Sequence, residues 1–133
     1  MQQISREKLK EKGIKRIFRS IKCSLDGLYY AYRYEQSLWL HGLLSIFTII
    51  LGLCFKIKLS EWAILFIALG SILSLELLNT AIEANVDLVT LEYNRLAKIA
   101  KDCGSAASFV MSIVAFIICL MVFEPYFVTF LGR

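Results

Sequence analysis

The stretch that decides the fold is residues 62–87, WAILFIALGSILSLELLNTAIEANVD, an apolar run that acquires evenly spaced polar residues in its second half. Glu76, Asn79, Glu83 and Asp87 follow one another at intervals of three, four and four. Because residues three and four apart share one face of an α-helix, these side chains form one polar stripe, about 16 Å long, on an otherwise apolar helix.

This polar stripe begins inside or at the edge of a membrane, because the apolar run leads directly into it. Ionisable side chains at membrane depth cost roughly 2.5–3.5 kcal/mol each on insertion, and they usually face a bundle interior, a partner or a wet cavity. The stripe therefore predicts a functional site. The alternative is a set of interhelical pairs that only fixes packing.

Composition places the chain among membrane proteins. Its 133 residues suit one domain, 58% of them are hydrophobic, and the mean hydropathy is +0.64. Segments 38–55 and 106–123 carry no charge, and each is close to the roughly 20 residues that cross a bilayer. Little chain is left for a large soluble domain.

The segment from residue 62 is short before Glu76 interrupts it, so a re-entrant piece is one interpretation. We interpret it as a full span, because its helical apolar pattern continues to Val86. The link at 56–61 predicts a tight turn with Ser60 as the N-cap of the second span, and hence an antiparallel hairpin. Glu124 and Pro125 are expected to close the third span.

The N-terminal part differs from the spans in its charge. Apolar residues recur at helical spacing between Ile14 and Leu28, with basic residues between them, which predicts an amphipathic helix on the membrane surface. We therefore predict an all-α membrane protein with three transmembrane helices and an N-terminal amphipathic surface helix. The expected bounds are a charged tail at 1–12, then a single membrane domain at 13–133 with its surface helix at about 14–34 and its spans at about 36–56, 61–89 and 104–124.

Positive charge predicts the orientation of the spans. Residues 1–41 contain nine Lys or Arg and the loop at 87–105 contains three, whereas the turn at 56–61 has two. The positive-inside rule then places the N-terminus and the second loop on the cytoplasmic side. The polar stripe opens to the same side, where nucleotides are found.

Several classes of site are excluded. The four cysteines follow no metal-binding spacing, and His41 is the only histidine, so a zinc site cannot be built. No Gly-rich phosphate loop is present, which excludes the ordinary soluble nucleotide folds, and no nucleic-acid partner is expected.

The carboxylates of the polar stripe and Lys101 suit the binding and transfer of phosphate. Carboxylates bind hard divalent cations such as Mg²⁺, and Lys101 supplies the positive charge that a polyphosphate needs. A carboxylate in a region of low dielectric has a raised proton affinity and can act as a general base toward a hydroxyl. Together these groups predict phosphoryl transfer to an alcohol within the membrane.

Two sequence blocks carry a family resemblance. Residues 76–87, ELLNTAIEANVD, are followed by KDCGSAA at 101–107, and Glu35 precedes the first span. This pattern resembles the prokaryotic diacylglycerol kinase family, which includes undecaprenol kinases, over about residues 16–123. The resemblance implies a multi-pass protein of the bacterial inner membrane, a homotrimer whose active sites form between subunits on the cytoplasmic side, with Mg²⁺ as cofactor and ATP as co-substrate.

The resemblance also implies roles for individual residues. Glu76 is the expected catalytic base, and Glu35 and Glu83 are the expected metal ligands. The expected nucleotide-binding residues are Arg16, Asn79, Glu83, Asp87, Glu92, Asn94, Lys101 and Asp102. The expected lipid-binding residues are Trp39, Glu76 and Ser105. Asn94 departs from the family pattern, since many relatives have His at that position.

The expected acceptor is undecaprenol or diacylglycerol. Residues 104–107 resemble the diacylglycerol kinase branch, whereas His41, six residues after Glu35, resembles the undecaprenol kinase branch, which we favour. The alternative function is a non-catalytic membrane protein that binds a divalent cation or lipid, such as a channel or assembly subunit. That alternative needs the polar stripe but does not need Lys101 and Asp102 beside it.

Overall fold

The computed structural model describes residues 13–132, and the charged tail predicted at 1–12 lies outside these residues. The described chain is all-helical. Its four α-helices are α1 (Ile14–Tyr34), α2 (Gln36–Phe55), α3 (Leu59–Val89) and α4 (Arg95–Leu131). Contacts divide the chain into a unit that contains α1 and a second unit that begins at Glu35, and the candidate site below is described within the second unit.

Helix α1 leaves its apolar side chains exposed. Ile14 is 72% exposed and Phe18 is 70% exposed, and basic residues lie between the apolar ones along the helix. The apolar side chains of α1 are therefore not buried within its own unit, and they remain accessible for contacts outside it.

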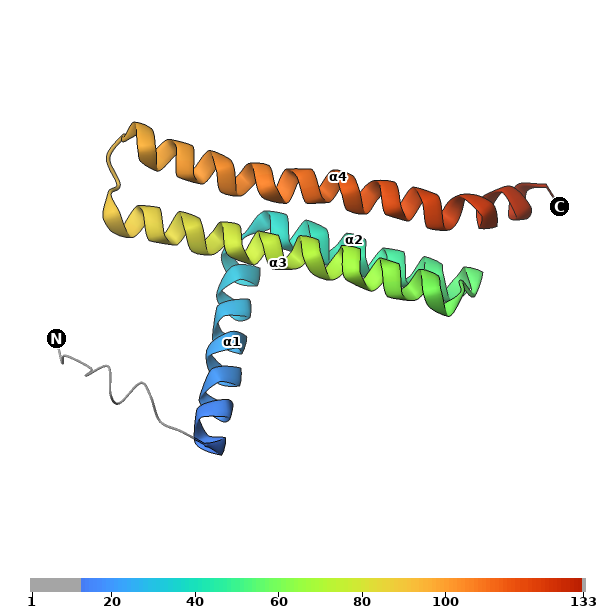
Figure 1. The fold of residues 1–133 in the computed structure, drawn as a ribbon, viewed down its shortest axis with the longest axis horizontal. Helices are drawn as coiled ribbons and strands as arrows, with labels where there is room; N and C mark the ends of the chain where they lie inside the picture. Colours follow the sequence, from blue (N-terminus) through green and yellow to red (C-terminus); the bar gives the residue numbers. More distant parts are fainter. Residues whose placement is uncertain (1–12, 133) are drawn as a thin grey trace. The chain divides into compact units, whose positions relative to one another are not determined.

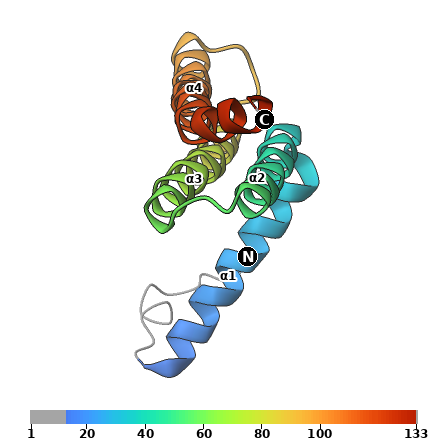
Figure 2. The ribbon, with the colours of Figure 1, turned by 90° about the vertical axis from the view of Figure 1, so that its right-hand side faces the viewer.

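The other three helices are each long and apolar enough to cross a membrane, which confirms the three spans predicted from the sequence. Helix α3 packs against both α2 and α4 and makes most of the contacts in this unit (Figures 1 and 2). It is one continuous helix of 31 residues through the whole polar stripe. A re-entrant turn is therefore not needed to explain the early position of Glu76.

The start of α3 corrects one prediction. Ser60 is not the N-cap, because the helix already begins at Leu59 and Lys58 occupies the cap position. The Glu61 carboxylate accepts a hydrogen bond from the Lys58 backbone N–H at 2.7 Å and so satisfies a backbone donor at the helix start. The cap rule that favours a short hydroxyl side chain does not cover this arrangement, in which the carboxylate three residues after the cap binds its backbone N–H.

Helix α4 is longer than the expected third span. It continues through Pro125 to Leu131, although proline removes one backbone donor and crowds the preceding turn. The end of the helix bends away from the rest of α4 in Figure 2, as expected near a proline. Tyr126, just after the proline, donates a hydrogen bond of 2.6 Å to Glu61 and so joins this part of α4 to the start of α3.

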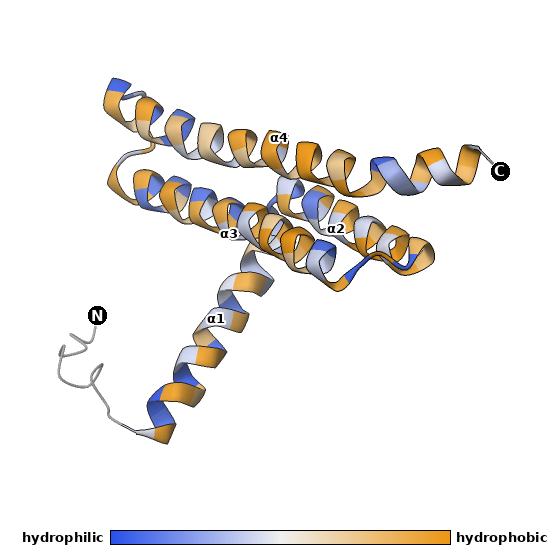
Figure 3. Ribbon diagram, turned by 45° about the vertical axis from the view of Figure 1, so that its right-hand side comes forward, coloured by the Kyte–Doolittle hydropathy of each residue, from blue (hydrophilic) through white to orange (hydrophobic). Residues whose placement is uncertain are grey.

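The apolar core lies at the same end of the unit as Pro125. It is formed by Ile57, Leu65, Val122 and Phe123, and Phe55 packs against it. Polar residues gather at the opposite end, in the C-terminal half of α3 and the first turns of α4, where Figure 3 shows much of the blue colour. The apolar core thus stabilises one end of the three-helix unit, and the polar residues that could form a functional site lie at the other end.

Candidate active site

Glu76 is the most buried carboxylate of the polar stripe. Its residue is 6% exposed, although charged side chains are almost never buried without partners. Both of its oxygens have partners on α2: the Ser37 hydroxyl donates to Oε2 at 2.7 Å, and His41 Nε2 lies 3.3 Å from Oε1. The carboxylate is therefore held in one orientation from one side.

Helix α4 completes this cluster. Ser112 Oγ lies 3.5 Å from His41 Nε2, and the Ser112 hydroxyl donates to the Ser108 carbonyl at 2.9 Å. Three helices thus meet around Glu76. Ser37 and Ser112 were not among the predicted site residues, since only the packing of distant segments brings them to the carboxylate.

One turn further along the stripe, Asn79 and Glu83 form a second polar pair. Asn79 Nδ2 donates to Glu83 Oε1 at 2.9 Å, which orients the Glu83 carboxylate. Asn79 Oδ1 is buried and has no hydrogen-bond partner among the described residues. An unpaired buried carbonyl is unusual, and it leaves an acceptor for a donor supplied by a ligand.

Gly104 on α4 makes this arrangement possible. A Cβ atom at this position would lie 2.5 Å from Asn79 Oδ1 and 3.4 Å from Ile82 Cδ1. Only glycine lets α4 approach so close to Asn79 without displacing its side chain. Gly104 is therefore a supporting residue of the site.

We expect Gly104→Ala to raise the KM for Mg-ATP by about tenfold, because the new methyl group forces Asn79 to turn away from Glu83 and a charge-assisted hydrogen bond is lost. Steady-state kinetics in mixed micelles measure this change. The matched control is Gly70→Ala on α3, where an added Cβ meets nothing within 4 Å. An unchanged KM in Gly104→Ala would contradict the role given to this close approach.

The outer end of the stripe carries two ion pairs. Lys101 Nζ lies 2.6 Å from Asp87 Oδ1 and joins α4 to α3, whereas Lys98 pairs with Asp102 within α4. Exposed pairs of this kind contribute little stability, so their side chains can exchange partners when a charged ligand arrives. Lys101 and Asp102 are neighbours in sequence, but each has a different partner.

The loop before α4 holds two further candidates. Asn94 is the N-cap of α4, and its Oδ1 accepts from the backbone N–H groups of Leu96 at 2.8 Å and Ala97 at 3.3 Å. This cap gives Asn94 a structural function and occupies its side-chain oxygen. Glu92 is exposed, and its backbone N–H donates to Thr90 Oγ1 at 3.1 Å.

Glu35 stands at the N-terminus of α2, immediately outside the membrane-spanning helices. Burial raises the pKa of its carboxyl, and the neighbouring carboxylates of Glu83 and Glu76 raise this pKa further. The carboxyl of Glu35 therefore lies within electrostatic reach of two carboxylates of α3. Repulsion between these carboxylates favours a proton or a cation between them.

The donor set at Glu35 and Glu83 suits Mg²⁺. No group of three or more His, Cys, Asp or Glu side chains within residues 13–132 is arranged to hold a metal ion. Mg²⁺ often binds through only one or two carboxylates, with waters and substrate phosphates as its other ligands. Two carboxylates from this chain therefore fit a metal ion that arrives with a nucleotide.

The remaining predicted residues lie on three different helices. Trp39 is 55% exposed on α2, and Ser105 is exposed on α4 close to Gly104. Arg16 lies on α1, in the other unit, and is exposed. The roles of these three residues stay predictions.

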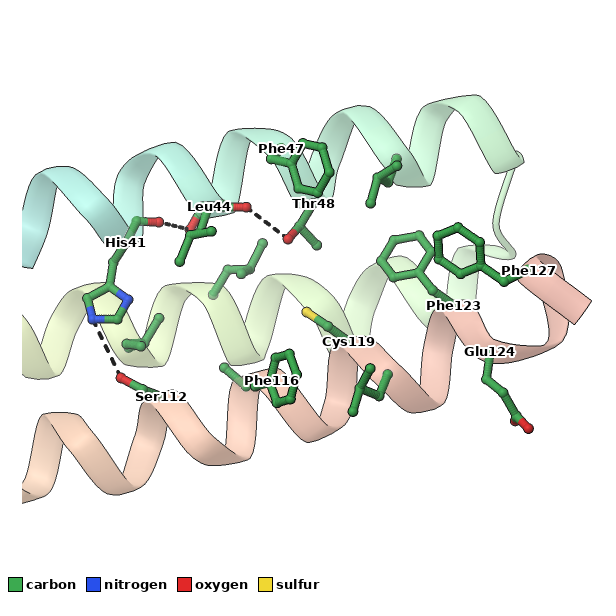
Figure 4. A pocket seen from close by; sticks show the side chains of 16 residues that line it. His41, Leu44, Phe47, Thr48, Ser112, Phe116, Cys119, Phe123, Glu124 and Phe127 are labelled. Carbon is green, nitrogen blue, oxygen red and sulfur yellow. Dashed lines mark hydrogen bonds between the residues drawn. The ribbon is translucent and has the colours of Figure 1, made fainter.

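An apolar cavity of about 930 Å³ begins beside this cluster. His41 and Ser112 lie at one end, and Phe123, Glu124 and Phe127 lie at the other (Figure 4). Most of its lining is hydrocarbon, with α2 and α4 forming opposite walls. The buried carboxylate is thus bordered by polar groups toward the loop and by an apolar space along the bundle.

The family of the chain follows from comparison with known sequences. The model of the prokaryotic diacylglycerol kinase family matches residues 22–123. The chain belongs to this family. It is therefore a lipid kinase, and the non-catalytic alternative is not needed.

Individual relatives in this kinase family differ in the lipid that they are named for. The undecaprenol kinase of Bacillus subtilis is 37% identical over 112 residues, covering 84% of this chain and 91% of the relative. The diacylglycerol kinase of Pseudomonas aeruginosa is 41% identical over 98 residues, covering 74% and 80%. The diacylglycerol kinase of Escherichia coli is 30% identical over 115 residues, covering 86% and 94%.

Proposed function

We propose that this lipid kinase transfers the γ-phosphate of ATP to the hydroxyl of undecaprenol, with Glu76 as the general base. The observation that carries this proposal is the buried Glu76 carboxylate, which two side chains orient from one side. Glu76 lies seven residues before Glu83 on α3, about two helical turns deeper. The proposed base thus lies near the apolar region, where the lipid that accepts the phosphate is found. The phosphate site lies nearer to water, from which ATP arrives.

In the proposed reaction, the Glu76 carboxylate accepts the proton of the lipid hydroxyl. The hydroxyl oxygen forms a bond to the γ-phosphorus while the bond from this phosphorus to the β-γ bridging oxygen breaks, and ADP leaves with that oxygen. The products are undecaprenyl phosphate, ADP and a protonated Glu76, which then loses its proton.

The charges nearer the loop hold the nucleotide in this proposal. Glu35 and Glu83 would hold Mg²⁺, and the ion would supply positive charge for the phosphate oxygens of ATP. Lys101 exchanges its contact with Asp87 for the phosphates, and Asn79 Oδ1 accepts a hydrogen bond from the bound ligand. Asp87, Glu92, Asn94 and Asp102 border the nucleotide, and Trp39 and Ser105 border the lipid. Arg16 is a further proposed nucleotide-binding residue.

The surroundings of this site follow from charge and hydropathy. We place the three spans in the bacterial inner membrane, with the N-terminus and the active site on the cytoplasmic side, because the basic residues are concentrated there. Helix α1 lies on the membrane surface through its exposed apolar residues. Three chains assemble into a homotrimer, and neighbouring chains complete each active site.

Diacylglycerol is the second candidate acceptor, giving phosphatidic acid. The P. aeruginosa relative, which is named for this lipid, favours it. The B. subtilis relative, which is named for undecaprenol and is covered over more of its length, favours the first candidate. The apolar cavity beside His41 is consistent with either lipid.

The test is transfer of labelled γ-phosphate from Mg-ATP to undecaprenol and to diacylglycerol, side by side in mixed micelles. We expect label in the undecaprenol product, with lower kcat/KM for diacylglycerol. A higher kcat/KM for diacylglycerol than for undecaprenol would make diacylglycerol the proposed acceptor. The absence of transfer to either lipid would overturn the proposed reaction.

A further inference from the structure

Two oxygen atoms lie near one ring nitrogen of His41. His41 Nε2 faces Glu76 Oε1 at 3.3 Å and Ser112 Oγ at 3.5 Å. The Ser112 hydroxyl uses its hydrogen toward the Ser108 carbonyl, so its oxygen faces His41 as an acceptor. Both neighbours of Nε2 are then acceptors, an arrangement that suits the tautomer with its hydrogen on Nε2.

This N–H group lies beside the carboxylate oxygen that Ser37 does not use. Ser37 donates to Oε2, His41 Nε2 lies 3.3 Å from Oε1, and the two residues are four apart on the same face of α2. Contacts at both oxygens restrict rotation of the carboxylate about its last bond. Each oxygen still has a lone pair free for a substrate hydroxyl.

His41 is itself held in place. Its side chain is 16% exposed and lines one end of the apolar cavity, and Ser112 of α4 lies near the same ring nitrogen as Glu76 (Figure 4). The imidazole is therefore in contact with residues of both α3 and α4. A rigid planar ring is suited to transmit the position of α4 to a residue of α3.

We propose that His41 is a positioning residue for the kinase reaction, which holds the Glu76 carboxylate through Nε2–H while Ser112 holds the imidazole. This inference rests on the proposed function, in which Glu76 is the base. The predicted effect is on kcat rather than on nucleotide binding, because His41 acts on the carboxylate and not on the phosphate site. A misplacement of about 1 Å in an active site costs on the order of 100-fold in rate.

The test compares His41→Gln, whose side-chain amide places a donor near the position of Nε2, with His41→Leu, which has similar bulk but no donor. We expect His41→Leu to lower kcat by about 10- to 100-fold with an unchanged KM for Mg-ATP. We expect His41→Gln to restore most of that loss. Wild-type kcat in His41→Leu, or an equal loss in both variants, would overturn the proposal.

Two further variants complete the test. Thr129→Val is the control, because the Thr129 hydroxyl likewise donates to a carbonyl four residues earlier, that of Pro125, and does not line the cavity, so we expect wild-type kinetics. If His41→Leu does not fold, His41→Asn replaces it. Its amide is polar but too short to reach Glu76, so we expect the same loss of kcat, and wild-type kcat would overturn the proposal.

The outcome also separates this inference from the proposed function. Activity in Glu76→Gln would remove the base assignment whatever His41 does. An inactive Glu76→Gln together with a fully active His41→Leu would leave the proposed function in place and remove only the positioning role.

Discussion

Glu76→Gln is expected to abolish phosphoryl transfer while the protein remains folded and still binds ATP. A general base contributes about 10²- to 10⁴-fold to a rate, so we expect at least a 100-fold lower kcat. Glutamine has the same shape, and its carbonyl oxygen can accept from His41 while its amide donates to the Ser37 oxygen. The cluster therefore keeps its hydrogen bonds and loses only the proton acceptor.

Labelled-phosphate transfer to each lipid measures this effect, and the melting temperature in detergent checks the fold. Glu61→Gln is the matched control on the same helix, because Glu61 is bonded to Lys58 and Tyr126 at the opposite end of α3. We expect the control to retain its activity. Substantial turnover in Glu76→Gln would assign the base to another group.

Glu83→Gln is expected to lose Mg²⁺-dependent binding of ATP. The glutamine carbonyl can still accept the hydrogen bond from Asn79, so the substitution removes the charge and keeps the orientation. Because the number of charged ligands sets the affinity of a carboxylate site for a divalent cation, we expect an increase in Kd of at least about tenfold.

Thermal stability in detergent measures this binding independently of turnover. A ligand at 100 times its Kd adds about 2.7 kcal/mol to the folded state, so Mg-ATP should raise the Tm of the wild type. At the same concentration, the shift should be much smaller in Glu83→Gln and unchanged in Glu124→Gln, whose exposed carboxylate lies near Pro125. An undiminished shift in Glu83→Gln would contradict its role as a metal ligand.

The sequence was sufficient to predict the helices, because their apolar runs and helical periodicity are local properties. It also predicted the polar stripe of α3, since four residues at intervals of three and four must share a helix face. The ends of the helices were less predictable. Glu61, not Ser60, accepts the hydrogen bond of a backbone N–H at the start of α3. Helix α4 continues through Pro125, and Tyr126 beyond it is hydrogen-bonded to Glu61 of α3.

The partners of the stripe could not be predicted in the same way. Whether Ser37 and His41 of α2 face Glu76 depends on how two helices rotate about their axes, and this rotation is set by packing over the whole contact. The closeness of Gly104 to Asn79 has the same origin. Local sequence thus predicted which residues are unusual, but the contacts that orient them follow from tertiary structure.

The unpaired oxygen of Asn79 has a consequence for the energetics of the empty enzyme. A buried carbonyl without a donor destabilises a protein by about 1–3 kcal/mol, and here Gly104 permits that state rather than filling the space. A ligand that supplies the missing donor recovers this free energy on binding. The unpaired oxygen therefore lowers the free energy of unfolding of the ligand-free protein. A ligand that pairs with this oxygen gains the corresponding free energy of binding.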